Sequence, residues 1–254
     1  MRKTFVIDSL PESALRYGND CAVVAVDVIR ATTMAITAVK RGRQCYPVDT
    51  LDAAFQLAHS LQNPLLAGEI NGETAAGLEM NNSPAELEAR SDTYRPLVFL
   101  SSSGTRLIMT ARGCDTLYLA CFRNSLSMGL RLIREKHTRI ALLGAGSRGE
   151  FREEDQICCA WIAALLVRAG YVPENDSTVK VLNRWANAKP SDCLISRSVE
   201  YLRRTGQLAD LRFILERIDD LAETFILQND QVVMVTPDVR LNRQLDHMPM
   251  YQGA

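Results

Sequence analysis

The chain has few of the residues that mark common metal, redox and thiol-based catalytic sites. It holds only three histidines, and these are far apart in the sequence: His59, His137 and His247. Its seven cysteines include no CxxC pair, which excludes the usual zinc-ribbon spacings and argues against a disulfide framework. No cysteine is followed six positions later by arginine, so the phosphate loop of cysteine-dependent phosphatases is missing. We interpret most cysteines as small core residues.

Other absences concern partners and location. There is no run rich in lysine and arginine, and the formal net charge is -1, which argues against a nucleic-acid partner. No apolar stretch reaches membrane-spanning length, so we expect no membrane partner. The first residues, MRKTFVIDSLPES, hold an apolar run too short for a secretory signal, and we expect a cytoplasmic protein. The oligomeric state stays open, a homodimer included.

What is present indicates an α/β protein. Short apolar runs alternate with amphipathic stretches in six strand-to-helix units, with the strands in AVVAV, CYPV, PLLAGEI, LVFL, TLYLA and RIALLG. This rhythm predicts a three-layer α/β/α fold with a mainly parallel sheet. We expect a single domain over residues 1–254, with a motif-rich part at 20–170. A helical and strand-like part follows at 171–237, and residues 238–254 are predicted to form a tail.

Residues 22 to 42 contain the closest grouping of charged and hydroxyl side chains that could form a ligand site. A buried strand ends on Asp27, and Arg30, Thr32 and Thr33 follow before a helix. Because ligand sites of parallel sheets lie at the carboxyl ends of strands, this group suits a metal ion and an anionic substrate. The alternative is that Asp27 and the threonines cap the helix and that Arg30 pairs on the surface.

Polar residues recur at the other predicted strand ends. The carboxylates Asp27, Glu69, Glu154 and Asp155 together could supply oxygen ligands to a Mg²⁺ ion. Besides the cap at Asp27, Glu69 fits a loop, and Glu154 and Asp155 fit the acidic first turn of a helix. The joint pattern favours a site, and we predict catalytic roles for Asp27, Arg30, Glu69 and Asp155.

Two turns, SSSGT and GAGSRG, each lead into a helix and are suited to hold phosphate or sulfonate oxygens. The predicted substrate and phosphate contacts are Arg30, Ser102, Ser103, Gly104, Thr105, Asn124, Gly146 and Arg148. Arg30 is suited to a bidentate grip of an anion. The serines also have an alternative as a helix cap.

The identity of the nucleophile is open at this point. A metal-bound water activated by a carboxylate is favoured over direct attack by Asp27. Phosphatases with an aspartyl nucleophile use a DxDxT motif, and this chain has Ile29 where that motif has its second aspartate.

The glycines Gly144, Gly146 and Gly149 also match the GxGxxG fingerprint of dinucleotide-binding proteins. The helix that follows begins with three acidic residues, which would repel a pyrophosphate. No strand ending in an acidic residue follows at the expected distance of about 20 residues. We therefore favour a phosphate site over a dinucleotide site.

Taken together, five segments resemble the Mg²⁺-dependent 2-phosphosulfolactate phosphatases of coenzyme M biosynthesis. The segments are VAVDVIRATT, AGEINGE with NNSPAEL, LSSSGT, CFRNS and GAGSRGEFREEDQICCA, in that family's order, over about residues 20 to 170. The resemblance implies an α/β fold, a magnesium requirement and hydrolysis of a phosphate monoester on a sulfonated three-carbon acid. The family usually has threonines and an asparagine in the third motif, where this chain has three serines, a difference that bears on the substrate.

The function predicted from the sequence is hydrolysis of 2-phospho-3-sulfolactate to sulfolactate and phosphate. One alternative is a hydrolase for another small phosphorylated acid on the same scaffold. The other is a protein that binds a small anion without catalysis. An enzyme is favoured because an anion binder has no need of four carboxylates at the strand ends.

Overall fold

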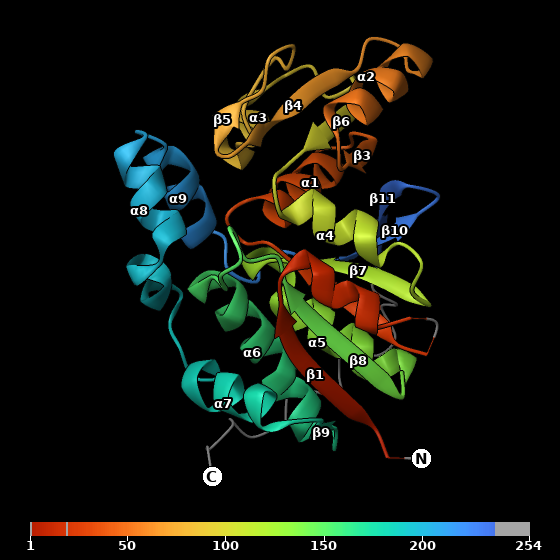
Figure 1. Ribbon diagram of the computed structural model, residues 1–254, viewed down its shortest axis with the longest axis vertical. Helices are drawn as coiled ribbons and strands as arrows, with labels where there is room; N and C mark the ends of the chain where they lie inside the picture. Colours follow the sequence, from red (N-terminus) through yellow and green to blue (C-terminus); the bar gives the residue numbers. More distant parts are fainter. Residues whose placement is uncertain (1, 19, 237–254) are drawn as a thin grey trace.

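The computed structural model describes residues 2–18 and 20–236, and it has the predicted three-layer α/β/α fold (Figure 1). The strands are β1 (Thr4–Ser9), β2 (Ala22–Val26), β3 (Cys45–Val48), β4 (Leu65–Ile70), β5 (Glu73–Thr74), β6 (Leu97–Leu100), β7 (Thr116–Ala120), β8 (Arg139–Gly144), β9 (Val172–Pro173), β10 (Thr224–Gln228) and β11 (Gln231–Val235). The helices are α1 (Ala31–Lys40), α2 (Leu51–Ser60), α3 (Pro84–Ala89), α4 (Gly104–Ala111), α5 (Ser125–Glu135), α6 (Glu153–Arg168), α7 (Asp176–Trp185), α8 (Arg197–Arg204) and α9 (Leu208–Leu215). Short 3-10 helices span Pro11–Arg16, Phe122–Asn124 and Pro190–Ile195. The predicted tail lies outside the described residues.

The strands of the described residues form one sheet in the order β5-β4-β6-β3-β11-β10-β7-β2-β8-β1-β9. Two groups of parallel strands, β4-β6-β3 and β7-β2-β8-β1-β9, are joined by the hairpin β10-β11. The hairpin is antiparallel to both of its neighbours, β7 and β3. The end of the described chain therefore occupies the middle of the sheet.

All six strands predicted from the sequence are confirmed as β2, β3, β4, β6, β7 and β8. β2 reads AVVAV and is buried along its whole length, as expected for a parallel strand covered on both faces. The sequence analysis did not find β1, which pairs in parallel with β8 from Thr4 opposite Arg139 to Ser9 opposite Gly144. Only three of its six residues are buried, and its apolar run is short.

The helices begin where local capping groups favour them. The hydroxyl of Ser83 accepts a hydrogen bond from the amide of Glu86, with Pro84 at the first position of α3. Asn175 caps α7 in the same way by accepting from the amide of Thr178. α6 packs on β1, β2 and β8, whereas α4 packs on β2 and β3.

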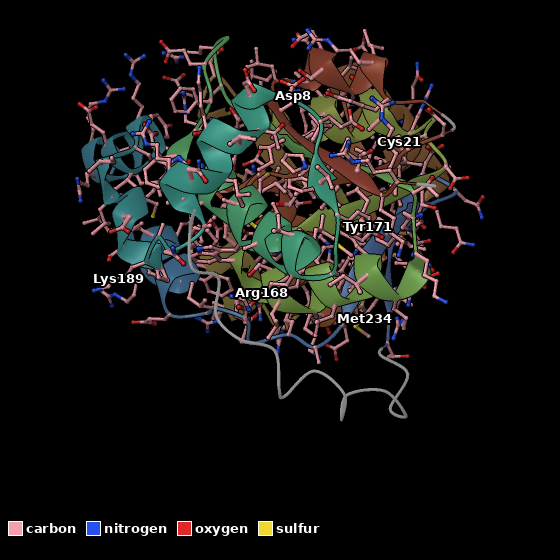
Figure 2. All side chains as sticks on the ribbon, turned by 90° about the horizontal axis from the view of Figure 1, so that it is seen from below. Asp8, Cys21, Arg168, Tyr171, Lys189 and Met234 are labelled. Carbon is pink, nitrogen blue, oxygen red and sulfur yellow. The ribbon has the colours of Figure 1, made fainter. Side chains whose placement is uncertain are left out.

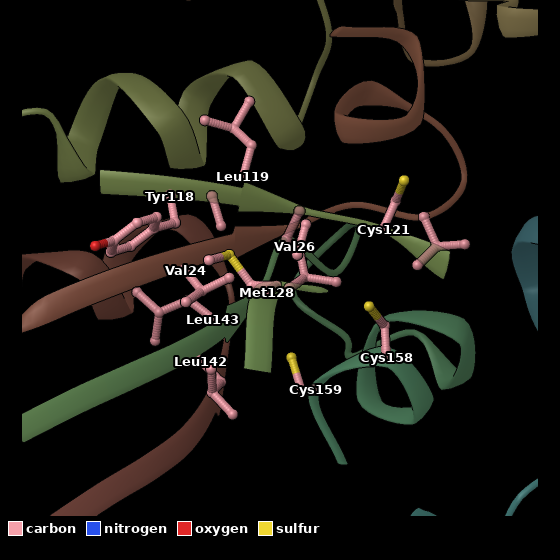
Figure 3. Close-up of a cluster of buried hydrophobic side chains, with 14 of the residues drawn as sticks. Val24, Val26, Tyr118, Leu119, Cys121, Met128, Leu142, Leu143, Cys158 and Cys159 are labelled. Carbon is pink, nitrogen blue, oxygen red and sulfur yellow. The ribbon is translucent and has the colours of Figure 1, made fainter. Parts of the chain in front are cut away.

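The core lies between these helices and the sheet. Figure 3 shows part of it, including Met128 from α5, Cys158 and Cys159 from α6, and Val24 and Leu142 from the strands. All seven cysteines lie in the described residues as free thiols, and six of them are buried. This confirms their interpretation as core residues.

The C-terminal helices α8 and α9 stand to one side of the sheet (Figure 1), and Lys189 lies at the outer edge of that side when the molecule is seen from below (Figure 2). Of the helices in the part of the chain that is described, none is both long enough and apolar enough to cross a membrane.

Gly68 offers a test of the sheet geometry. It has φ +145°, and a Cβ atom there would lie 2.2 Å from the backbone oxygen of Leu100 on β6. Because backbone cannot move aside as a flexible side chain can, we expect Gly68→Ala to lower the free energy of unfolding by about 3 kcal/mol or more. Urea denaturation followed by circular dichroism measures this change.

Gly113 is the matched control, since an added Cβ there meets nothing within 4 Å. We expect Gly113→Ala to change the free energy of unfolding by less than about 1 kcal/mol. Equal effects of the two substitutions would contradict the close approach of β4 to β6.

Candidate active site

The carboxyl ends of β2, β4, β6 and β8 border a cavity of about 600 Å³. Its wall includes Asp27 after β2, Glu69 in β4, Ser102 after β6 and Gly146 after β8. The sequence analysis assigned these four residues to strand ends, and the fold brings them to one cavity because parallel strands end at one edge of a sheet. α8 forms a further part of the wall.

Asp27 is a nearly buried carboxylate at this cavity, with 7% of its surface exposed. Burial raises its pKa to about 7, and the negative charges of Glu154 and Glu69 add to the effect. Gly104 makes room for it, because a Cβ at that position would lie 2.1 Å from Asp27 Oδ2. The glycine of the SSSGT turn is thus explained by the space that the carboxylate needs.

Asp155 and Glu154 lie in the first turn of α6 and do not line the cavity. Asp155 Oδ1 accepts a hydrogen bond from the amide of Val28 (2.9 Å), and Oδ2 accepts from the amide of Gly146 (3.2 Å). Asp155 therefore joins the turns that follow β2 and β8. Burial, followed by the charge of Asp27, raises its pKa well above the ordinary value.

Glu154 has no exposed surface, and neither carboxylate oxygen makes a hydrogen bond to a described residue. Burial raises its pKa, while the nearby hydroxyls of Ser198 and Ser196 lower it in part. An unpartnered buried carboxylate is costly. A proton or a nearby cation would relieve that cost.

The side chains at the cavity can be compared with the ligands that the predicted Mg²⁺ ion needs. No three of the histidine, cysteine and carboxylate side chains in the described residues lie close enough together to hold a metal. A site of four protein carboxylates is therefore not preformed. Magnesium usually takes one or two protein carboxylates together with water and substrate oxygens, and Asp27 and Glu69 at the cavity wall fit that arrangement.

Glu69 holds the turn after β4 against the serine turn after β6. Its Oε1 accepts from the amide of Ser102 (2.7 Å), and its Oε2 accepts from the hydroxyl of Ser102 (2.9 Å) and the amide of Gly72 (2.5 Å). Both donors of Ser102 are thus used inside the protein, although the residue itself lines the cavity.

Thr105 is also occupied within the protein. Its hydroxyl donates to the backbone oxygen of Ser101 (2.9 Å), and its amide donates to the Ser101 hydroxyl (2.9 Å). Thr105 is fully buried and lies in the first turn of α4. By contrast, the amides of Ser103 and Gly104 donate to no described residue. Of the SSSGT turn, these two amides are the donors best suited to an anionic oxygen.

The glycine-rich turn closes through two backbone hydrogen bonds, from Ser147 to Glu150 (2.8 Å) and back (3.1 Å). Its two central residues, Arg148 and Gly149, have φ of 53° and 75°. Such a turn favours asparagine and glycine, so arginine at the first central position carries backbone strain. Arg148 is exposed and lines the cavity, where its charge can meet an anion.

The same turn bears on the dinucleotide alternative. A pyrophosphate in such a turn would need free backbone amides at the start of the helix. The amide of Gly146 instead donates to the Asp155 carboxylate, and the first turn of α6 is acidic. The geometry therefore favours the phosphate site over the dinucleotide site.

The two remaining predicted contacts have different places. Arg30 lines the cavity with 6% of its surface exposed, and its guanidinium pairs with Asp210 at 2.5 Å. Asn124 is fully buried and is not part of the cavity wall. Its side chain accepts from the amide of Cys121 (2.9 Å) and donates to the backbone oxygen of Leu119 (3.2 Å). These contacts assign Asn124 to the turn after β7.

Several residues at the site were missed from the sequence. Asp210 and Gln207 contact Arg30 from about 180 positions away, and Tyr201 and Arg197 of the α8 segment line the cavity. The helix segments that carry them read as ordinary amphipathic sequence. No local pattern signals these residues, because their role depends on where α8 and α9 pack.

Comparison with known proteins places this site in a family. Residues 6–229 match a family model described as 2-phosphosulpholactate phosphatase. A protein named probable 2-phosphosulfolactate phosphatase from Symbiobacterium thermophilum is 31% identical over 221 residues, 84% of this chain and 93% of that protein. One of the same name from Synechocystis is 29% identical over 202 residues, 76% of this chain and 83% of the relative. The family match thus extends beyond residue 170 through α8 and α9.

The raised pKa of Asp27 predicts a dependence of stability on pH. Between about pH 4 and pH 7 the folded protein holds a proton on Asp27 that the unfolded chain releases, so this group's contribution to stability falls as pH rises through that window. We expect Asp27→Asn, without divalent cations, to raise the free energy of unfolding at pH 8 on the order of 1–3 kcal/mol. The gain should be smaller at pH 5. Urea titrations at both pH values test this, and a variant less stable than the parent at pH 8 would contradict it.

The strain at Arg148 predicts opposite effects on stability and binding. Asparagine adopts the left-handed conformation more readily than arginine, so we expect Arg148→Asn to raise the free energy of unfolding by about 0.5 kcal/mol. Loss of the cavity charge should weaken binding of inorganic phosphate about threefold or more, measured by isothermal titration calorimetry. Arg112→Asn is the control, because Arg112 is exposed, has φ -57° and lies off the cavity wall. Unchanged phosphate affinity in Arg148→Asn would remove Arg148 from the site.

Proposed function

This chain belongs to the 2-phosphosulfolactate phosphatase family, and we propose that it hydrolyses 2-phospho-3-sulfolactate to sulfolactate and phosphate in a Mg²⁺-dependent reaction. The observation that carries the proposal is a nearly buried carboxylate, Asp27, at the wall of a cavity that is also lined by arginines. The family makes the chain a phosphoric monoester hydrolase. Its place in coenzyme M biosynthesis and its cytoplasmic location remain predictions.

The charge of the cavity wall supports the proposed substrate class. 2-Phospho-3-sulfolactate carries a phosphate, a sulfonate and a carboxylate, so it needs several separate donor groups. The wall offers the guanidinium groups of Arg30 and Arg148 and the amide of Ser103, whereas Gly104 is buried directly behind it and is not part of the wall. Amides at the start of α4 suit a compact anionic group, because the positive end of the helix dipole lies there.

Asp27 is suited to handle the proton of the attacking water. Without a cation, burial raises the pKa of Asp27 to about 7, and a bound cation would lower it and keep the carboxylate ionised, so that it can orient the attacking water and accept its proton. Gly104 keeps the carboxylate oxygen in place, since any larger residue would displace Oδ2. Direct attack by Asp27 on phosphorus is the second choice.

Asp27 and Glu69 are the residues that would hold Mg²⁺ at the cavity, with Asp155 and Glu154 close behind Asp27. When bound, the ion supplies positive charge to the non-bridging phosphate oxygens. Asp155 fixes the turns after β2 and β8 through the amides of Val28 and Gly146, so it orients both sides of the site.

The proposal is tested by phosphate release from 2-phospho-3-sulfolactate and from 2-phospholactate, which lacks the sulfonate. We expect a kcat/KM at least about tenfold higher for the sulfonated substrate, because a lost charged contact is worth roughly 1.4 kcal/mol or more. Activity should disappear in excess chelator and return with Mg²⁺. Asp27→Asn serves as the inactive control.

Other outcomes lead to different conclusions. Equal rates on both compounds would point to another small phosphorylated acid as substrate. Binding of 2-phospho-3-sulfolactate by calorimetry without any phosphate release would indicate an anion-binding protein. Full activity in excess chelator would remove magnesium from the proposal.

A further inference from the structure

The guanidinium of Arg30 is held from several directions. Nη1 donates to Asp210 Oδ2 at 2.5 Å and to Gln207 Oε1, and Nη2 donates to Asn81 Oδ1 at 2.8 Å. Three of the five N–H groups of a guanidinium are thereby used. Its Nε–H and the second N–H of Nη2 make no hydrogen bond to a described residue, and Arg30 lines the cavity. Two donors therefore stay available to a ligand.

Asp210 is the only charged partner among these contacts, and it uses both of its oxygens. Oδ2 accepts from Arg30, while Oδ1 accepts from the Ser83 hydroxyl (2.6 Å) and from the amide of Ala85 (3.0 Å) at the start of α3. Its side chain is 1% exposed and that of Arg30 is 5% exposed. A side chain at this position must accept on both sides, which a carboxylate does and an amide cannot.

The pair is poorly explained by stability alone. Burying two charges costs desolvation energy that their attraction repays only in part, and apolar residues often stabilise such a position as well. A buried ion pair at the wall of a cavity is better explained by its effect on the ligand site. It keeps a charged guanidinium in one orientation beside the place where an anion binds.

The attachment of the C-terminal helices supports this reading. Tyr201 of α8 donates its hydroxyl to the backbone oxygen of Gly72 (2.5 Å), and the side-chain amide of Asn81 donates to the same oxygen (3.2 Å). The turn after β4, the segment before α3 and the two helices are thus connected around Arg30.

We propose that Asp210 is a positioning residue of the active site, which holds the Arg30 guanidinium oriented so that its two remaining N–H groups bind an anionic group of the substrate. This inference rests on the proposed function and deepens it. It assigns the α8–α9 helix pair a role in orienting a substrate-binding group.

The test compares two variants that share one structural loss. Asp210→Asn leaves a single oxygen for two sets of donors, so either Arg30 or the start of α3 loses its acceptor. Ser83→Ala removes one contact on the α3 side and leaves the Arg30 contact intact. We expect Asp210→Asn to lower kcat/KM at least about tenfold, mainly through KM, since the contact is made to the ground state as well. Ser83→Ala should stay within about twofold of the parent.

Two further measurements separate this inference from the proposed function. The first is the Nε–H resonance of Arg30 in ¹⁵N-labelled protein, assigned by its absence in Arg30→Lys. The second is the affinity for inorganic phosphate by calorimetry. We expect a resolved Arg30 resonance in the parent and in Ser83→Ala, and its loss together with weaker phosphate binding in Asp210→Asn. Neither measurement requires turnover, so a parent without phosphatase activity would overturn only the proposed function.

The opposite results overturn the inference. An Arg30 resonance and a phosphate affinity unchanged in Asp210→Asn, equal losses in Asp210→Asn and Ser83→Ala, or no Arg30 resonance in the parent would each do so. If Asp210→Asn does not fold, Asp210→Glu keeps the charge, but its additional CH₂ group shifts the carboxylate relative to Arg30 and to the start of α3. That variant must then weaken phosphate binding and broaden the Arg30 resonance, and no change in either would overturn the proposal.

Discussion

The arrangement of this molecule depends on how negative charge is accommodated at the carboxyl ends of β2 and β8. Asp27 and Asp155 are both buried there, and burial raises the pKa of each carboxyl, with the negative charge of Glu154 adding to both effects. Backbone amides relieve part of this cost, since Val28 and Gly146 donate to Asp155. The negative charge that these amides do not compensate favours a bound cation or a proton at the site. A site that is costly when empty is well prepared for a charged ligand.

In the SSSGT turn, some hydrogen-bond donors are used inside the protein and others are not. Ser102 and Thr105 use their donors inside the protein, where they hold the turns after β4 and β6 and start α4. The amides of Ser103 and Gly104 donate to no described residue, and Ser103 lines the cavity. The motif thus contains residues whose donors build the turn and residues whose amides are free.

The C-terminal third of the chain enters both the sheet and the site. The hairpin β10-β11 closes the gap between β3 and β7, so that the two parallel groups become one sheet. Before that hairpin in the sequence, Asp210 of α9 accepts hydrogen bonds from Arg30 and from the start of α3. A guanidinium beside a cavity would otherwise be free to turn toward Asp27 or away from the ligand. The contact from α9 restricts that freedom, at the cost of desolvating two charges.

The sequence by itself determined six of the parallel strands, the mainly parallel sheet and the strand-end residues of the cavity, because apolar period and strand-end polarity are local signals. The sequence also predicted Asn124 and Thr105 as ligand contacts, whereas both side chains make hydrogen bonds within their own turns. Residue type alone does not reveal which hydrogen bonds a side chain already makes. Tertiary structure alone decided that β10-β11 lies in mid-sheet and that Asp210 holds Arg30. Both depend on pairing between segments more than 100 residues apart, and the free energy of such pairing resides in the packed molecule and leaves no periodic trace in either segment.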